Sequence, residues 1–171
     1  ETYFFADTTV NVNPSAQDLV EIIGMTAEKV RFFGETPRIA LLSYSNFGSN
    51  RDEESMKTAE AVRLAKQKWP DLIIDGELQA NIALNPALMK EHYPFSELAE
   101  RGANTLSFPN LASGNIAYKL LQEIGGAEAI GPVLMGMRKP VHILQLGSSV
   151  REIVNMVAIG IADAQLVNGN R

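Results

Sequence analysis

Residues 140–155 read PVHILQLGSSVREIVN and predict a strand, a turn and a helix in succession. The apolar run 140–146 has the length of a strand and Gly147 supplies the turn. The S-x-x-E pattern of Ser149 and Glu152 is typical of a capping box at a helix start. The free N–H groups and the positive dipole end of such a helix favour a bound phosphate or carboxylate. Because most capped turns of this kind are only structural, a ligand site and a purely structural turn both remain open.

The same alternation of strands and helices runs through the rest of the chain. Apolar residues at helical spacing, bounded by capping residues, proline and glycine, predict helices at 15–33, 52–69, 86–92, 113–125 and 149–165, with one helical turn at 96–101. Short apolar runs predict strands at 3–6, 38–44, 72–75, 104–108, 129–136 and 140–146, the third entering a turn at Asp75-Gly76. This order predicts an α/β fold, a three-layer α/β/α sandwich around a mainly parallel sheet. The last helix is apolar over most of its circumference, so we expect it to be covered on more than one side.

Composition excludes several classes of protein. The 171 residues are 46% hydrophobic and 20% charged, as in ordinary globular proteins. A net charge of −5 disfavours nucleic-acid binding, and the sequence has neither a signal-peptide pattern nor an apolar run that could cross a membrane. The absence of cysteine excludes disulfides and thiolate chemistry and fits a cytoplasmic location. Since the chain starts at Glu1 and enters an apolar segment at once, we expect it to be a piece of a longer polypeptide.

Few residues carry an obvious chemical signature. The dinucleotide, P-loop and serine-hydrolase glycine motifs are all absent. The two histidines, His92 and His142, lack metal-ligand spacing, and no metal site is expected; His142 lies in an apolar run, which favours a packed side chain over a catalytic base. Asp7 and Asp75 follow predicted strands and are interpreted first as turn-capping carboxylates. The basic residues of helix 52–69 indicate a solvated face: Lys57, Arg63, Lys66 and Lys68.

Small polar residues, glycine and asparagine gather in the loops that follow the predicted strands. In parallel α/β sheets, ligands usually lie beyond the carboxyl ends of the strands. We therefore expect a cleft lined by the loops 43–50, 75–81, 108–115 and 145–149.

Several segments, read together, carry a specific resemblance. They are ADTTVN (6–11), LSYS (42–45), DGELQ (75–79), FPNL (108–111), GNIAYK (114–119), GGAEAIGP (125–132) and the stretch 140–155. They resemble the carboxyl-terminal half of phosphotransacetylases (phosphate acetyltransferases). They resemble still more closely the phosphotransacetylase-like region that ends the large bacterial NADP-dependent malic enzymes. The malic-enzyme variety is indicated by SNFGS (45–49), KPVH (139–142) and SSVREIVNM (148–156).

The resemblance implies a fold of two α/β/α lobes, related to isocitrate and isopropylmalate dehydrogenases, with the acyl-CoA site between the lobes. Residues 1–165 would form a single second lobe. The helix 149–165 would pack on a first lobe that is missing here, and residues 166–171 would be a tail. In this family the second lobe is also the usual homodimer surface.

The resemblance also implies where chemistry would occur. An active phosphotransacetylase uses an aspartate to deprotonate the CoA thiol, which attacks acetyl phosphate, and a Ser-Arg pair to bind and polarise the reacting groups. The matching positions here are Gln145 and Leu146 for the pair and Glu152 for the aspartate. Leu146 cannot replace a fixed guanidinium, so the resemblance implies that acetyl transfer is lost.

Three hypotheses follow. The first is a non-catalytic regulatory and oligomerisation domain of an NADP-dependent malic enzyme (malate to pyruvate and CO2), with acetyl-CoA or a related acyl-CoA as its effector. NADP and the divalent metal would belong to the missing amino-terminal part, and a second copy of the chain would be a partner. The second hypothesis is part of an active phosphate acetyltransferase, and the third is a purely structural oligomerisation lobe. The expected ligand-binding residues are Ser43, Tyr44, Ser45, Asn46, Asn110, Asn115, Gln145, Leu146, Gly147, Ser148 and Ser149.

Overall fold

The chain is built from two compact units, Glu1–Tyr118 and Lys119–Arg171. A computed structural model describes the backbone of residues 2–169 and the side chains of residues 2–165. The first unit contains the sheet and the helices that cover it. The second contains the end of α5 (Leu111–Gly125), an extended segment and α6 (Val150–Gly169).

The sheet of the first unit is parallel throughout. Its strands are β1 (Phe4–Ala6), β2 (Arg38–Leu42), β3 (Ile73–Leu78) and β4 (Thr105–Ser107), in the spatial order β1-β4-β2-β3. Ile39 of β2 lies opposite Ile74 on one side and Thr105 on the other. These pairings confirm the predicted α/β class with a parallel sheet.

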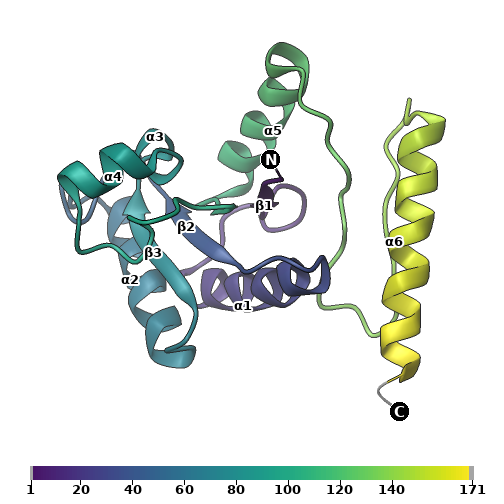
Figure 1. The fold of residues 1–171 in the computed structure, drawn as a ribbon, viewed down its shortest axis with the longest axis horizontal. Helices are drawn as coiled ribbons and strands as arrows, with labels where there is room; N and C mark the ends of the chain where they lie inside the picture. Colours follow the sequence, from purple (N-terminus) through teal and green to yellow (C-terminus); the bar gives the residue numbers. More distant parts are fainter. Residues whose placement is uncertain (1, 170–171) are drawn as a thin grey trace. The chain divides into compact units, whose positions relative to one another are not determined.

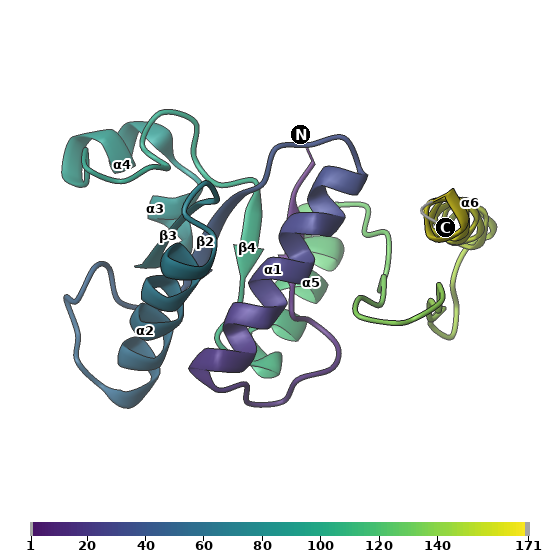
Figure 2. The same cartoon turned by 90° about the horizontal axis from the view of Figure 1, so that it is seen from below.

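Helices cover both faces of this sheet. Ile39 and Leu41 pack against α1 (Ala16–Phe32) and α2 (Glu53–Lys68), while Ala40 and Leu42 face the opposite layer. That layer contains α3 (Ala80–Ala83), α4 (Pro86–His92) and the beginning of α5. Figure 1 shows the two layers on either side of the strands, and Figure 2 views the sheet from the side of α1 and α2. The predicted three layers are thus present.

Capping residues place the helix starts where the sequence predicts them. Ser15 and Asp18 form a capping box at α1, in which the Ser15 N–H donates to the Asp18 carboxylate at 2.9 Å. At α2, Asp52 accepts from the N–H of Glu54 at 2.9 Å, and at α4 Asn85 accepts from the N–H of Leu88 at 3.1 Å. Each side chain satisfies a backbone donor that the first helical turn cannot pair internally.

The predicted strands 129–136 and 140–146 are wrong. Both segments are extended, but they share only an isolated antiparallel bridge between Val133 and His142. Pro132 and Pro140 have no N–H to donate, and a ladder interrupted in this way does not extend into strands. Apolar periodicity alone does not reveal that the partners are missing.

One smaller prediction is also wrong, and another is met in part. Asp75-Gly76 is not a turn, because β3 continues through both residues to Leu78. Gly76 has φ +146°, and a Cβ there would lie 2.7 Å from the Leu41 carbonyl oxygen, so glycine is required by close backbone contact and not by a turn. Residues 96–101 form consecutive turns, one of them closed by the helical bond from the Gly102 N–H to the Leu98 carbonyl at 2.8 Å, so the predicted helical turn is met in part and no regular helix forms. The short helix α3 has no counterpart among the predictions.

The last helix is confirmed and is longer than predicted. The backbone of α6 is helical to Gly169, so most of the predicted tail is helix, and residues 170–171 lie outside the described residues. Met156 is buried, whereas Val150, Val154 and Ile161 remain more than half exposed. That this face packs on a further lobe stays a prediction. No helix in the described part of the chain is both long and apolar enough to cross a membrane.

Candidate functional site

The carboxyl edge of the sheet in the first unit brings predicted ligand residues together. Because β2 and β4 are neighbouring parallel strands, the loops that follow them leave the sheet at the same edge. One loop carries Ser43, Tyr44, Ser45 and Asn46; the other leads through Asn110 to Asn115.

A buried glutamate fixes the first of these loops. The side chain of Glu77 in β3 is 1% exposed. Its Oε1 accepts from the Ser45 hydroxyl at 2.8 Å and from the Gly48 N–H at 2.6 Å, and its carbonyl oxygen accepts from the Phe47 N–H at 2.9 Å. Phe47 has φ +47°, which is unusual for a bulky residue and costs conformational energy. The loop is thus held in a strained conformation by one carboxylate. Glu77 was not among the predicted site residues, and its only signal in the sequence is a charged residue beside Leu78 after an apolar run.

The predicted ligand residues of this loop mostly support its shape. Ser45 is fully buried against Glu77, and the Asn46 side-chain oxygen accepts from the Gln79 N–H at 2.8 Å. Tyr44 is 58% exposed and its hydroxyl donates to Asp52. This bond raises the pKa of Tyr44, while the Ser55 hydroxyl and then Tyr44 hold the pKa of Asp52 well below its usual range. The Tyr44 ring is therefore the exposed part of the loop that best suits contact with a ligand.

Asp7 organises the loop after β1. Its carboxylate accepts from the N–H groups of Thr9 and Asn11, both at 2.7 Å, and of Val10 at 3.0 Å. Burial acts to raise the pKa of Asp7, but these hydrogen bonds, with one from the Asn11 side chain, hold it below its ordinary value. The prediction of a turn-capping carboxylate is confirmed.

Lys57 ties three segments of this edge together. Its Nζ lies 2.9 Å from a Glu54 carboxylate oxygen and donates to the side-chain oxygen of Asn13 at 3.1 Å and the carbonyl of Pro109 at 3.2 Å. The side chain is only 15% exposed, so its assignment to a solvated face is wrong. The helix period had placed Lys57 beside the other basic residues of α2 but could not reveal the loops that cover it.

The asparagines of the second loop have defined partners. Asn110 caps α5 by accepting from the Ser113 N–H at 3.0 Å, and the Asn115 side chain donates to the Thr8 carbonyl at 3.3 Å. Asp75 is not a turn cap: it lies within β3, 3.2 Å from Nζ of Lys66, and accepts from the Glu97 N–H at 3.3 Å.

The turn before α6 belongs to the second unit. The Ser148 N–H donates to the Gln145 carbonyl at 3.1 Å, and Gly147 has φ +89°, the left-handed conformation such a turn needs. The predicted capping box is confirmed: the Ser149 N–H donates to Glu152 Oε2 at 2.6 Å, and the Glu152 N–H donates to the Ser149 hydroxyl at 3.2 Å. Leu146 is fully exposed. That this turn shares a cleft with the loops of the first unit stays a prediction.

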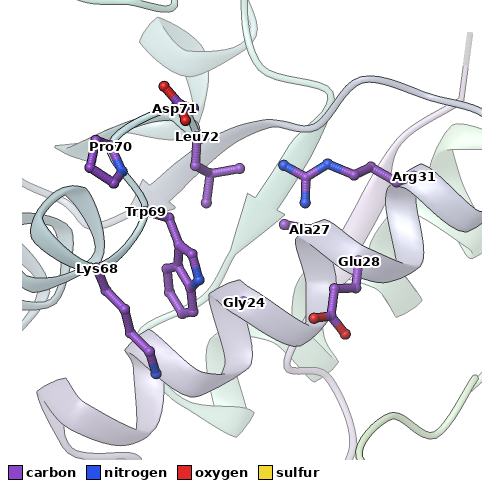
Figure 3. A pocket seen from close by; sticks show the side chains of 9 residues that line it. All are labelled: Gly24, Ala27, Glu28, Arg31, Lys68, Trp69, Pro70, Asp71 and Leu72. Carbon is purple, nitrogen blue, oxygen red and sulfur yellow. The ribbon is translucent and has the colours of Figure 1, made fainter.

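A groove of about 330 Å³ also lies in the first unit, by the residues that precede β3. In Figure 3 the Trp69 indole and the Arg31 guanidinium point into it, while Lys68 and Asp71 point away. Its lining carries two basic and two acidic side chains, so its charge favours no class of ion. The groove contacts Leu72, which lies just before the amino end of β3. It is therefore separate from the loops that follow the carboxyl ends of the strands.

The described residues contain no group of three or more histidine, aspartate or glutamate side chains that could hold a metal ion. NADP and a divalent metal are the cofactors that the malic-enzyme resemblance implies. Their placement in another part of the polypeptide stays a prediction.

Comparison with known proteins identifies the family. The family model described as phosphate acetyl/butaryl transferase matches residues 1–161. The chain belongs to this family. It is 47% identical over 164 residues to an NADP-dependent malic enzyme of Escherichia coli and 41% identical over 164 residues to a phosphate acetyltransferase of Bacillus subtilis. A phosphotransacetylase structure from Streptococcus pyogenes superposes with a TM-score of 0.89 at 44% identity, covering 95% of this chain and 49% of that one.

The matched relatives are much longer than this chain. The alignments cover 95% of the chain and 21% of the E. coli malic enzyme, and 96% of the chain and 50% of the B. subtilis acetyltransferase. The chain thus spans between about a fifth and a half of the length of these relatives. The malic enzyme corresponds to the first hypothesis and the acetyltransferase to the second.

Proposed function

We propose that this chain is a regulatory domain of an NADP-dependent malic enzyme, which binds acetyl-CoA or a related acyl-CoA as an effector and does not transfer acetyl groups. The observation that carries the proposal is the chemistry of the turn before α6. At the positions where the family resemblance places Ser-Arg and an aspartate, the chain has Gln145, Leu146 and Glu152.

The geometry of these residues supports a loss of chemistry. Leu146 is fully exposed and cannot stabilise charge on a reacting phosphate, and losing one such group costs about 3–4 kcal/mol of transition-state stabilisation. Glu152 already accepts from the Ser149 N–H at 2.6 Å as half of a capping box.

Binding can persist without that chemistry. The loop 43–50 is fixed by Glu77 and presents Tyr44, and backbone donors of the 145–149 turn could serve a carbonyl or amide of an acyl-CoA. An effector couples to a distant active site through a free energy of typically about 1–3 kcal/mol, about a 5- to 150-fold change in affinity. The proposal includes a cytoplasmic location and a homodimer.

Calorimetric titration of the complete polypeptide with acetyl-CoA, alongside assays of malate oxidation, tests this function. We expect saturable binding and a malate turnover that changes with occupancy. Absence of binding at millimolar acetyl-CoA would leave the purely structural oligomerisation lobe as the better account.

An active phosphate acetyltransferase is the second candidate, favoured by 41% identity to the B. subtilis enzyme across 96% of the chain. Formation of acetyl-CoA from acetyl phosphate and CoA distinguishes the two. Robust turnover that persists in Glu152→Gln and Gln145→Ala would also show that the turn before α6 takes no part in the reaction.

A further inference from the structure

In the second unit, residues 142–149 lie alongside α6 and are attached to it at both ends. His142 contacts α6 at Asp163, and Ser149 caps the first turn of the same helix. The segment therefore runs antiparallel to the helix, as Figure 1 shows.

The extended length of this segment is only slightly greater than the distance between its two attachments. Val150 and Asp163 are thirteen positions apart, which corresponds to about 20 Å along a helix at 1.5 Å per residue. The seven steps from His142 to Ser149 can span at most about 23–25 Å when fully extended. A shift of the extended segment by one of its own residues would move His142 by about 3.3 Å relative to Asp163, more than their close contact tolerates.

The attachment at His142 is a buried polar contact. Nε2 of His142 lies 3.2 Å from Oδ2 of Asp163, and the two side chains are 8% and 12% exposed. Within the described residues, neither ring nitrogen of His142 has a hydrogen-bond partner, so the contact with Asp163 is a close approach of a buried nitrogen and a carboxylate oxygen without a hydrogen bond.

Other contacts hold the same arrangement without fixing the turn itself. Val133 bridges His142, and Arg151 pairs with Glu128 at 3.1 Å with its side chain 75% exposed. Such exposed pairs contribute little. The His142–Asp163 contact is thus the buried polar feature that sets the register of the segment on α6.

We propose that His142 and Asp163 are positioning residues for the 145–149 turn. They hold the extended segment in one register against α6, so that the turn presents its backbone groups to an acyl-CoA. This role rests on the proposed function, because the turn must bind the ligand for its position to matter.

The test compares His142→Gln and Asp163→Asn, singly and combined, in the complete polypeptide, with acetyl-CoA as the probe. His92→Gln is the matched control, since it makes the same change at the exposed histidine of α4. Calorimetry gives the dissociation constant at a temperature where circular dichroism shows each variant folded. Hydrogen exchange of residues 143–149 without ligand reports the register directly.

We expect each single variant to weaken acetyl-CoA binding about tenfold, the double variant to lose little more, and the control to bind like wild type. Exchange should quicken in 143–149 while the α6 amides stay protected. A variant that unfolds is replaced by Asp163→Glu, which keeps the charge and should bind better than Asp163→Asn.

Variants that bind like wild type, with exchange unchanged in 143–149, would overturn the positioning role and leave the proposed function intact. Wild type that binds no acetyl-CoA would defeat both. Independent, additive losses in the double variant would also contradict a joint action of the two residues.

Discussion

Glu77→Ala tests whether one buried carboxylate holds the loop after β2. The change removes two hydrogen bonds to a charged acceptor, from the Ser45 hydroxyl at 2.8 Å and the Gly48 N–H at 2.6 Å. Hydrogen bonds to charged groups contribute about 1.5–3 kcal/mol each. The desolvation of the carboxylate, which the variant no longer has to bear, offsets part of this sum. We expect the free energy of unfolding to fall by about 2–3 kcal/mol.

Urea unfolding followed by fluorescence measures this loss, because Trp69 is the single tryptophan of the chain and lies in the same unit as Glu77. Glu91→Ala on the exposed face of α4 is the control and should change stability by no more than about 0.5 kcal/mol.

Amide exchange gives the local signature of the same variant. The Gly48 N–H loses its acceptor and should exchange faster, whereas the Phe47 N–H keeps its bond to the Glu77 carbonyl at 2.9 Å and serves as an internal control. Unfolding within about 0.5 kcal/mol of wild type, or unchanged exchange at Gly48, would refute the reasoning.

Three further changes probe close contacts and charge. Gly76→Ala places a Cβ 2.7 Å from the Leu41 carbonyl at φ +146°, and should destabilise the chain by at least about 2 kcal/mol in urea unfolding. Gly24→Ala gains about 1 kcal/mol of helix propensity but puts a Cβ 2.5 Å from the Trp69 ring, so a net loss with a shifted Trp69 emission is expected. Folding lowers the pKa of Asp7, so its contribution to the free energy of unfolding is present above its unfolded pKa of about 4 and is lost as the pH falls. Asp7→Asn should therefore reduce the change in stability between about pH 5 and 2, measured from unfolding curves by circular dichroism.

Local chemistry made much of the first unit predictable. The starts of α1, α2 and α4 lie within one residue of the predicted positions, because the caps Ser15, Asp52 and Asn85 depend on residues within one turn. The apolar run of β2 likewise indicated a strand covered on both faces, which Ile39 and Ala40 confirm by packing into opposite layers.

Predictions that depended on distant partners failed. The runs around Val133 and His142 have strand composition, yet a strand exists only where a neighbour supplies donors and acceptors. Lys57 had the spacing of a solvated residue, and only the loops at Asn13 and Pro109 bury it. Gly76 looked like a turn glycine because the sequence cannot reveal how closely Leu41 passes.

The substitutions at Gln145 and Leu146 could be read from the sequence, whereas the hydrogen bond that Glu152 accepts could not. Its capping box was visible as a pattern, but the 2.6 Å contact with the Ser149 N–H is what commits the carboxylate to the helix start. The proposed loss of acetyl transfer thus draws on both kinds of observation.

Malate oxidation by the complete polypeptide, measured as NADPH formation across a titration with acetyl-CoA, tests the central claim most directly. We expect a saturable change in rate, with a midpoint that matches the calorimetric dissociation constant and that moves when Leu146 is changed to a bulkier side chain such as tryptophan. A rate that stays constant up to millimolar acetyl-CoA would contradict a regulatory role for this chain.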